Sequence, residues 1–193
     1  MRALLERREF TFSVSVTTRA RRPSEEDGVH YRFVDHDEFR RMIAADDLLE
    51  WAEYGPNLYG TPRAPVEAAL SRGEDVLLEI EIQGARQVRR THPSALLVFI
   101  APPDMGELER RLRRRGDTAD DAIRTRMEIA REEIDGASSV FDLIVVNDDV
   151  ERAAEEIEGF LDDPGSRGTG GSVYPAGVPR PGDHPGVREV QTE

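Results

Sequence analysis

The sequence contains no lysine and no cysteine, and it has only four histidines and one tryptophan. Because all 26 basic residues are arginine, no nucleotide-binding loop of the form G-x-x-x-x-G-K-[ST] occurs in it. Without cysteine there is no disulfide framework and no thiolate metal site. The histidines are spread along the chain, at His30, His36, His92 and His184, so no transition-metal centre held by protein ligands is predicted.

Long apolar runs are also missing, since no stretch approaches the roughly 20 residues that a membrane-spanning helix needs. The first residues lack the apolar core of a signal peptide, so a cytoplasmic location without a membrane partner is expected. A formal net charge of −13 argues against a nucleic-acid partner, which requires an extended basic surface. With 193 residues, 38% of them hydrophobic, the chain is long enough for one globular domain, and any anion site has to be a local arginine cluster.

Hydrophobic periodicity indicates alternating strands and helices. Apolar and hydroxyl residues alternate over residues 10–17, which predicts a strand with one buried face. Asp35 followed by Glu38 predicts a helix N-terminus, and Gly73 is suited to the left-handed end of a later helix. Alternation of strands and helices along a chain is typical of an α/β fold with a mainly parallel sheet. Further buried strands are predicted at residues 76–82, 95–100 and 141–146, with a basic helix near residues 83–90.

The second half of the chain contains a helical segment and a change of composition. Residues 104–137 are highly charged with helical periodicity and one clear break at Gly116, which predicts two helices that form a hinged flap. Residues 163–193 hold 7 of the 16 glycines and 5 of the 12 prolines. We therefore expect a folded domain over residues 1–161 and a disordered tail over residues 162–193.

A dense group of arginines follows the first predicted strand, in the segment S-V-T-T-R-A-R-R at residues 15–22. An arginine fork donates paired hydrogen bonds to two oxygens of a phosphate, so this segment is a candidate phosphate site. A solvated basic turn explains the same residues when they are taken alone.

Further motifs follow this segment in a fixed order, and together they make the chain resemble guanylate kinase over residues 3–161. The motifs are G-V-H-Y-R-F (28–33), L-E-W-A (49–52), N-L-Y-G-T (57–61), E-I-E-I-Q-G-A (79–85), R-L (111–112), R-G (115–116) and V-V-N-D-D (145–149). The resemblance implies a three-layer, P-loop NTPase-like parallel sheet, a small GMP-binding subdomain at about residues 14–82 and a helical lid at about residues 104–137. It also implies transfer of the γ-phosphoryl group of ATP to GMP, with Mg²⁺ carried by the ATP phosphates.

The matched residues suit the chemistry of a GMP acceptor. The phosphate needs cationic and hydroxyl donors, and the two adjacent N–H groups on the pairing edge of guanine need a carboxylate acceptor. Glu50 and Glu81 match the guanine positions, while Glu79 matches a position nearer the phosphate and metal. Tyr31 and Tyr59, taken alone, are equally well explained as core aromatics. The implied GMP-binding residues are Ser15, Arg19, Arg22, Tyr31, Glu50, Tyr59, Thr61, Glu79 and Glu81.

The predicted lid carries a second set of candidate residues. Arg111, Arg115 and Arg126 match positions that close over the transferred phosphoryl group, where arginines stabilise charge on its equatorial oxygens. The alternative is an exposed helix with salt bridges along its surface. Asn147 matches a position that contacts the donor adenine, and an ordinary turn asparagine is the alternative.

In guanylate kinases, a strand and a glycine-rich lysine loop precede the helix in which the resemblance begins. We therefore expect that Met1 stands at an internal codon or that the chain is truncated, and that these residues alone transfer phosphate negligibly. Two alternatives stay open, a non-catalytic guanylate kinase-like module that binds GMP or a partner, and a fragment that cannot hold its fold. The presence of Arg111, Arg115, Arg126 and Asn147 favours the kinase.

Overall fold

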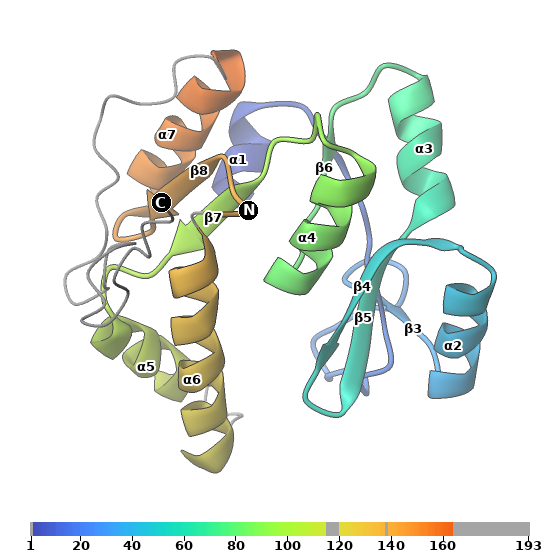
Figure 1. The fold of residues 1–193 in the computed structure, drawn as a ribbon, viewed down its shortest axis with the longest axis horizontal. Helices are drawn as coiled ribbons and strands as arrows, with labels where there is room; N and C mark the ends of the chain where they lie inside the picture. Colours follow the sequence, from blue (N-terminus) through green and yellow to red (C-terminus); the bar gives the residue numbers. More distant parts are fainter. Residues whose placement is uncertain (1, 115–119, 138, 164–193) are drawn as a thin grey trace, which may run out of the picture. The chain divides into compact units, whose positions relative to one another are not determined.

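The computed structural model describes residues 2–114, 120–137 and 139–163, and it divides into two compact units, Met1–Ala95 and Leu96–Glu193 (Figure 1). Arg115, Gly116 and residues 164–193 of the predicted tail lie outside the described residues. Among the residues that the structure describes, no helix combines the length and the apolar content that crossing a bilayer requires.

In the first unit, helix α1 (Arg2–Arg7) is followed by two short strands that belong to different sheets. Strand β1 (Thr11–Phe12) pairs in parallel with β6 (Val76–Leu77). Strand β2 (Val16–Thr17) is internal to a four-stranded sheet with the order β3-β2-β5-β4, in which β3 is Arg32–Phe33, β4 is Leu48–Tyr54 and β5 is Asn57–Pro62. The prediction of one strand over residues 10–17 is therefore wrong, because the N–H of Ser13 donates to Leu77 O while the N–H of Thr18 donates to Leu58 O.

Helix α2 (His36–Ala44) packs against the four-stranded sheet. It begins where Asp35 and Glu38 predict, since Asp35 Oδ1 accepts a hydrogen bond from the Glu38 N–H at 2.7 Å. Phe39 is fully buried, and Met42 lies beside it. Both side chains pack in one cluster with apolar residues of β2, β4 and β5, namely Val16, Leu48 and Leu58. The core of this unit thus lies directly beneath the strands that carry the candidate site.

Strands β4 and β5 form an antiparallel hairpin whose turn contains Gly55 at φ +58°. Helix α3 (Arg63–Ser71) follows directly and ends near Gly73, which has the predicted left-handed conformation at φ +79°. The strand predicted at residues 76–82 is confirmed only at β6, and Glu81 already serves as the extended N-cap residue of helix α4 (Ile82–Thr91). The segment from 78 to 81 is therefore a connection that carries polar side chains rather than a buried strand.

The second unit contains the parallel strands β7 (Val98–Ala101) and β8 (Leu143–Val146), paired in register along their whole length. Helix α7 (Val150–Asp162) packs on β8, and its N-cap residue Asp149 accepts from the Arg152 N–H at 2.9 Å. Two helices, α5 (Met105–Arg114) and α6 (Asp120–Ala137), occupy the predicted lid segment. They pack through Leu112, Ile123 and Met127. The parallel pairs in both units agree with the predicted α/β class.

Candidate functional site

The first unit contains a buried carboxylate at the centre of its candidate site. Glu50 of β4 is 4% exposed, and Thr61 of β5 is its direct neighbour across the hairpin. Thr61 Oγ1 donates a hydrogen bond of 2.6 Å to Glu50 Oε1. Burial raises the pKa of Glu50, and the hydrogen bonds from Thr61 partly oppose this shift. An acidic group that is buried next to a single hydroxyl donor keeps acceptor capacity for the N–H groups of a ligand.

The second carboxylate oxygen of Glu50 lies against the first turn of α4. A Cβ atom on Gly84 would lie only 2.0 Å from Glu50 Oε2, so the position has room for glycine alone while the carboxylate stays in place. Thr61 on one side and Gly84 on the other thus fix the orientation of Glu50. A fixed acceptor discriminates between ligands better than a mobile one because it cannot rearrange to suit a ligand without matching donors.

Two threonines fix the point at which the arginine-rich loop leaves β2. Thr17 is fully buried, and its Oγ1 donates to Leu58 O at 3.0 Å and accepts from the Arg19 N–H at 3.1 Å. Thr18 Oγ1 accepts from the Leu58 N–H at 2.9 Å. The loop therefore starts from a rigid position on the sheet.

The side chain of Arg19 is held by a carboxylate and two aromatic rings. Its Nη1 and Nη2 donate to Glu25 Oε2 and Oε1 at 3.1 and 2.7 Å. Its guanidinium carbon lies 5.6 Å from the ring centroid of Tyr31 and 5.8 Å from that of Phe33. The hydrogen bond from Arg19 lowers the pKa of Glu25 to about 2. Arg22 is exposed, and its backbone N–H donates to Glu25 Oε2 at 2.8 Å.

Two tyrosines lie next to Arg19. The rings of Tyr31 and Tyr59 meet edge to face with centroids 6.2 Å apart, and Tyr59 is paired with Thr17 across β2 and β5. Burial, followed by the nearby charge of Glu79, raises the pKa of Tyr31, so its hydroxyl remains a protonated donor at neutral pH. Phenolic hydroxyls beside a guanidinium suit an anion with several oxygens.

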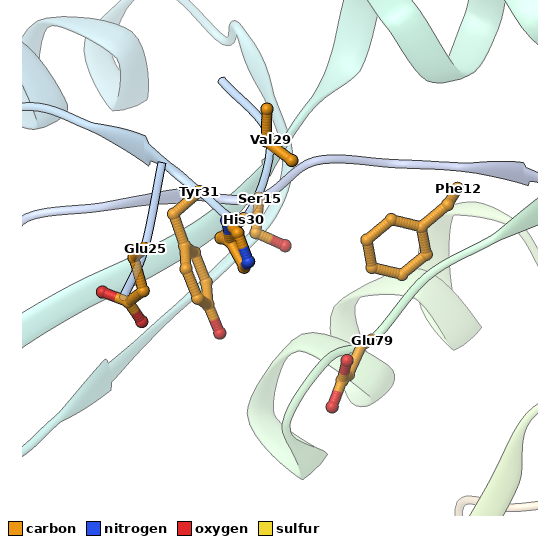
Figure 2. A pocket seen from close by; sticks show the side chains of 7 residues that line it. All are labelled: Phe12, Ser15, Glu25, Val29, His30, Tyr31 and Glu79. Carbon is orange, nitrogen blue, oxygen red and sulfur yellow. The ribbon is translucent and has the colours of Figure 1, made fainter. Parts of the chain in front are cut away.

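A pocket of about 270 Å³ opens beside Tyr31 (Figure 2). The hydroxyls of Ser15 and Tyr31 and the carboxylate of Glu79 border it, and the ring of Phe12 contributes an apolar wall. This volume is close to the lower end of the range of about 300–1,000 Å³ for small-molecule sites. The lining residues are Phe12, Ser15, Glu25, Val29, His30, Tyr31 and Glu79.

All of the predicted GMP-binding residues lie in the first unit, where they form separate groups, two of which share Tyr31 while the Glu50–Thr61 pair stands apart. Arg19, Tyr31 and Tyr59 are in mutual contact, and Glu50 pairs with Thr61. Ser15, Tyr31 and Glu79 share the pocket. Glu79 is exposed on the connection after β6, and Glu81 is half-buried at the start of α4.

Sequence reasoning missed four residues that line this pocket: Phe12, Glu25, Val29 and His30. Only Glu25 had a detectable signal, because it is a carboxylate within a segment of arginines that needs local charge compensation. Val29 and His30 lie within the motif at residues 28–33 and Phe12 within the alternating segment at residues 10–17, but neither pattern assigns these three side chains a binding role.

In the second unit, the structure brings Arg111 and Asn147 together. Arg111 Nε donates to Glu107 Oε1 at 2.8 Å, and its Nη2 donates to the backbone oxygen of Asn147 at 2.9 Å. Arg111, followed by Arg110, lowers the pKa of Glu107. Arg126 is half-buried on α6, whereas the predicted Arg115 lies outside the described residues. Arg110, Arg113 and Arg114 form ion pairs with Glu107 or Glu109, as the alternative of a helix with surface salt bridges predicts for them.

Within the described ranges, no group of three or more histidine, aspartate or glutamate side chains is arranged to hold a metal ion.

Comparison with known proteins gives one consistent result. The family model described as guanylate kinase matches residues 2–164. A guanylate kinase of Synechococcus sp. (strain JA-3-3Ab) is 52% identical over 153 residues, which cover 79% of this chain and 70% of that relative. A guanylate kinase of Thermus thermophilus is 52% identical over 158 residues, which cover 82% of this chain and 71% of that relative. The crystal structure of guanylate kinase from Anaplasma phagocytophilum superimposes with a TM-score of 0.71 at 36% identity, covering 83% of this chain and 78% of that one.

Proposed function

Because this chain belongs to the guanylate kinase family, we propose that it transfers the terminal phosphoryl group of ATP to GMP and forms ADP and GDP. The observation that carries the proposal is the buried, oriented carboxylate of Glu50 in a unit that also holds an arginine, two tyrosine hydroxyls and a pocket. ATP and GMP are metabolites of the cytoplasm, and the proposed reaction takes place there.

Glu50 is the proposed reader of the base. Guanine presents two adjacent N–H groups on its pairing edge, and a carboxylate accepts from both. Adenine presents a ring nitrogen lone pair at the corresponding position, which a carboxylate repels. Thr61 fixes Glu50 for this task, and Ser15 and Glu81 supply further polar groups from the same unit. The preference for guanine follows from the burial of Glu50. With adenine bound, its carboxylate would lack N–H partners, and burying an unpaired carboxylate costs free energy.

Arg19, Arg22, Tyr31 and Tyr59 are the proposed ligands of the GMP phosphate. Their role is to hold one phosphate oxygen in line with the γ-phosphorus of ATP, because phosphoryl transfer depends mainly on positioning and charge stabilisation. Tyrosine hydroxyls and guanidiniums donate hydrogen bonds without giving up a proton, so the acceptor phosphate stays anionic and nucleophilic.

The second unit supplies the proposed lid. Arg111, Arg115 and Arg126 stabilise the charge that spreads over the transferred group, and Asn147 contacts the donor adenine. Mg²⁺, held by ATP phosphates and water, neutralises charge on the donor. Glu79 fits an interaction with the hydrated ion, because its carboxylate is exposed at the border of the pocket and oxygen ligands are the kind that Mg²⁺ prefers.

Calorimetric titration with GMP and with AMP tests the acceptor site directly. We expect GMP to bind at least about 100-fold more tightly than AMP, and we expect Glu50→Gln to remove most of that preference. Equal affinity for the two nucleotides would contradict the assignment of Glu50. Transfer is then measured by following ADP formation with the protein isolated from its own cells, supplied with Mg²⁺, ATP and GMP.

A further inference from the structure

Arg19 and Glu25 form the most enclosed of the ion pairs described in the first unit. Their side chains are 18% and 10% exposed, and two parallel N–H···O bonds join them. A bidentate pair of this kind fixes the plane of the guanidinium as well as its position. The guanidinium carbon also lies over the rings of Tyr31 and Phe33, which pack beside it.

The geometry of the pair leaves one edge of Arg19 directed away from Glu25. Glu25 takes the edge formed by Nη1 and Nη2, and the backbone oxygen of Ala20 takes another Nη1 hydrogen at 2.7 Å. The remaining edge, formed by Nε and Nη2, carries two parallel N–H groups, and the Tyr59 hydroxyl lies close enough to interact with this guanidinium. Two parallel N–H groups match the spacing of two phosphate oxygens.

Glu25 is anchored independently of Arg19. Its Oε2 also accepts from the backbone N–H of Arg22 at 2.8 Å, and its backbone oxygen accepts from Arg21 Nη1 at 2.6 Å. In the view of Figure 2, the Tyr31 ring stands between Glu25 and the side of the pocket lined by Phe12 and Glu79. Glu25 also lines the pocket, and these hydrogen bonds fix its place in the loop.

We infer that Glu25 is a positioning residue, which holds Arg19 so that its Nε/Nη2 edge binds the phosphate of GMP. The inference rests on the proposed function, because it assumes that Arg19 binds the acceptor phosphate. Glu25 itself does not touch the reacting atoms. The Glu25 charge by itself would repel the phosphate dianion of GMP and weaken its binding. The inference predicts the opposite, that Glu25 strengthens GMP binding, because it orients the guanidinium of Arg19.

The test compares Glu25→Gln and Glu25→Asp with the matched variant Glu26→Gln, by calorimetric titration with GMP and with guanosine. Glu26 is exposed, and its hydrogen bonds with Val29 and His30 involve its backbone, so its substitution removes the same charge without disturbing Arg19. We expect both Glu25 variants to bind GMP about tenfold more weakly, because each loses the bidentate contact. Glu25→Asp keeps the negative charge, so a loss of GMP affinity in this variant would come from the changed geometry alone. Guanosine, which has no phosphate, should bind all variants within about twofold of wild type.

Two results would overturn the inference. The first is GMP affinity in Glu25→Gln that equals or exceeds that of wild type, which would make Glu25 a competitor of phosphate. The second is an equal loss of GMP and guanosine affinity, which would make its role purely structural. Arg19→Gln separates this inference from the proposed function. If Arg19→Gln binds GMP like wild type, the phosphate role of Arg19 is wrong. If Arg19→Gln loses GMP affinity while both Glu25 variants keep it, only the role of Glu25 is rejected.

Discussion

Gly84→Ala is the sharpest single test of how the buried carboxylate is held. The new Cβ would lie 2.0 Å from Glu50 Oε2 and 2.8 Å from Glu50 Cδ, although real Cβ contacts stay at or above about 3.0 Å. The carboxylate would therefore have to move by about 1 Å or more. Because Oε1 is already within 2.6 Å of Thr61 Oγ1, that movement either breaks or compresses the hydrogen bond.

Two effects of opposite sign decide the stability of this variant. Alanine in place of glycine inside α4 favours the helix by about 1 kcal/mol. Loss of a buried hydrogen bond to a charged group costs about 1.5–3 kcal/mol. The net expectation is a loss of about 0.5–2 kcal/mol, which corresponds to a fall in Tm of about 1–8 °C for a chain of this length. GMP affinity should fall about tenfold or more, because the proposed base reader is displaced.

Gly159→Ala in α7 is the matched control, because its added Cβ has no atom within 4 Å apart from its chain neighbours and the backbone of its own helix. This control should gain about 0.5–1 kcal/mol, since it receives the helix preference without the steric conflict. Thermal melts and GMP titrations of both variants complete the comparison. If Gly84→Ala gains stability like the control and keeps its GMP affinity, Glu50 does not need the space beside α4 and the reasoning is refuted.

Three further predictions test the helix cap, the core and the charge state of Glu50. Asp35→Ala removes the cap of α2 and should cost about 1 kcal/mol in urea unfolding, whereas Asp37→Ala, an exposed residue in the same turn, should change stability by less than about 0.5 kcal/mol. Phe39→Ala empties the centre of the first core and should cost about 3–5 kcal/mol in the same assay, and a cost below about 1 kcal/mol would contradict its central place. Burial raises the pKa of Glu50, so its ionisation disfavours the folded state. Wild type should therefore lose stability relative to Glu50→Gln as the pH rises from the ordinary Glu value through the raised pKa, and parallel curves in melts between about pH 4 and 8 would contradict this.

Local signals in the sequence predicted the ends of elements better than the pairing of strands. The caps at Asp35 and Gly73 are confirmed because a cap depends on a few neighbouring residues. Period-two alternation over residues 10–17 predicts a single strand, whereas the structure has two short strands, Thr11–Phe12 and Val16–Thr17, because alternation does not determine the pairing partner. Residues about 40 to 65 positions away, Leu58 and Leu77, accept the backbone hydrogen bonds that divide this segment between two sheets.

The candidate site shows the same division between local and distant information. Motifs identified Glu50 and Thr61 as separate candidates, while the β4–β5 register is what makes them a hydrogen-bonded pair. Gly84 contributes by having no side chain, a role that becomes visible only when Glu50 is placed against α4. Glu25 is not identifiable as a site residue from the motif, because a carboxylate that pairs with an arginine of a phosphate site has the same sequence signal as a carboxylate that compensates charge in an ordinary loop.

The composition of the chain and the geometry of its arginines have a common explanation. A guanidinium is planar and has more than one edge of N–H donors, so a carboxylate can bind one edge while another edge faces a ligand. The ammonium of lysine is a compact point charge without separate donor edges. Glu25 holds Arg19 by Nη1 and Nη2, and Glu107 holds Arg111 by Nε, with the Asn147 carbonyl accepting from Nη2. Each of these carboxylates offsets positive charge on its arginine and fixes the orientation of the guanidinium. A strongly acidic chain without lysine can therefore still present oriented hydrogen-bond donors to phosphate groups, because each guanidinium keeps N–H groups of fixed direction after a carboxylate has paired with it.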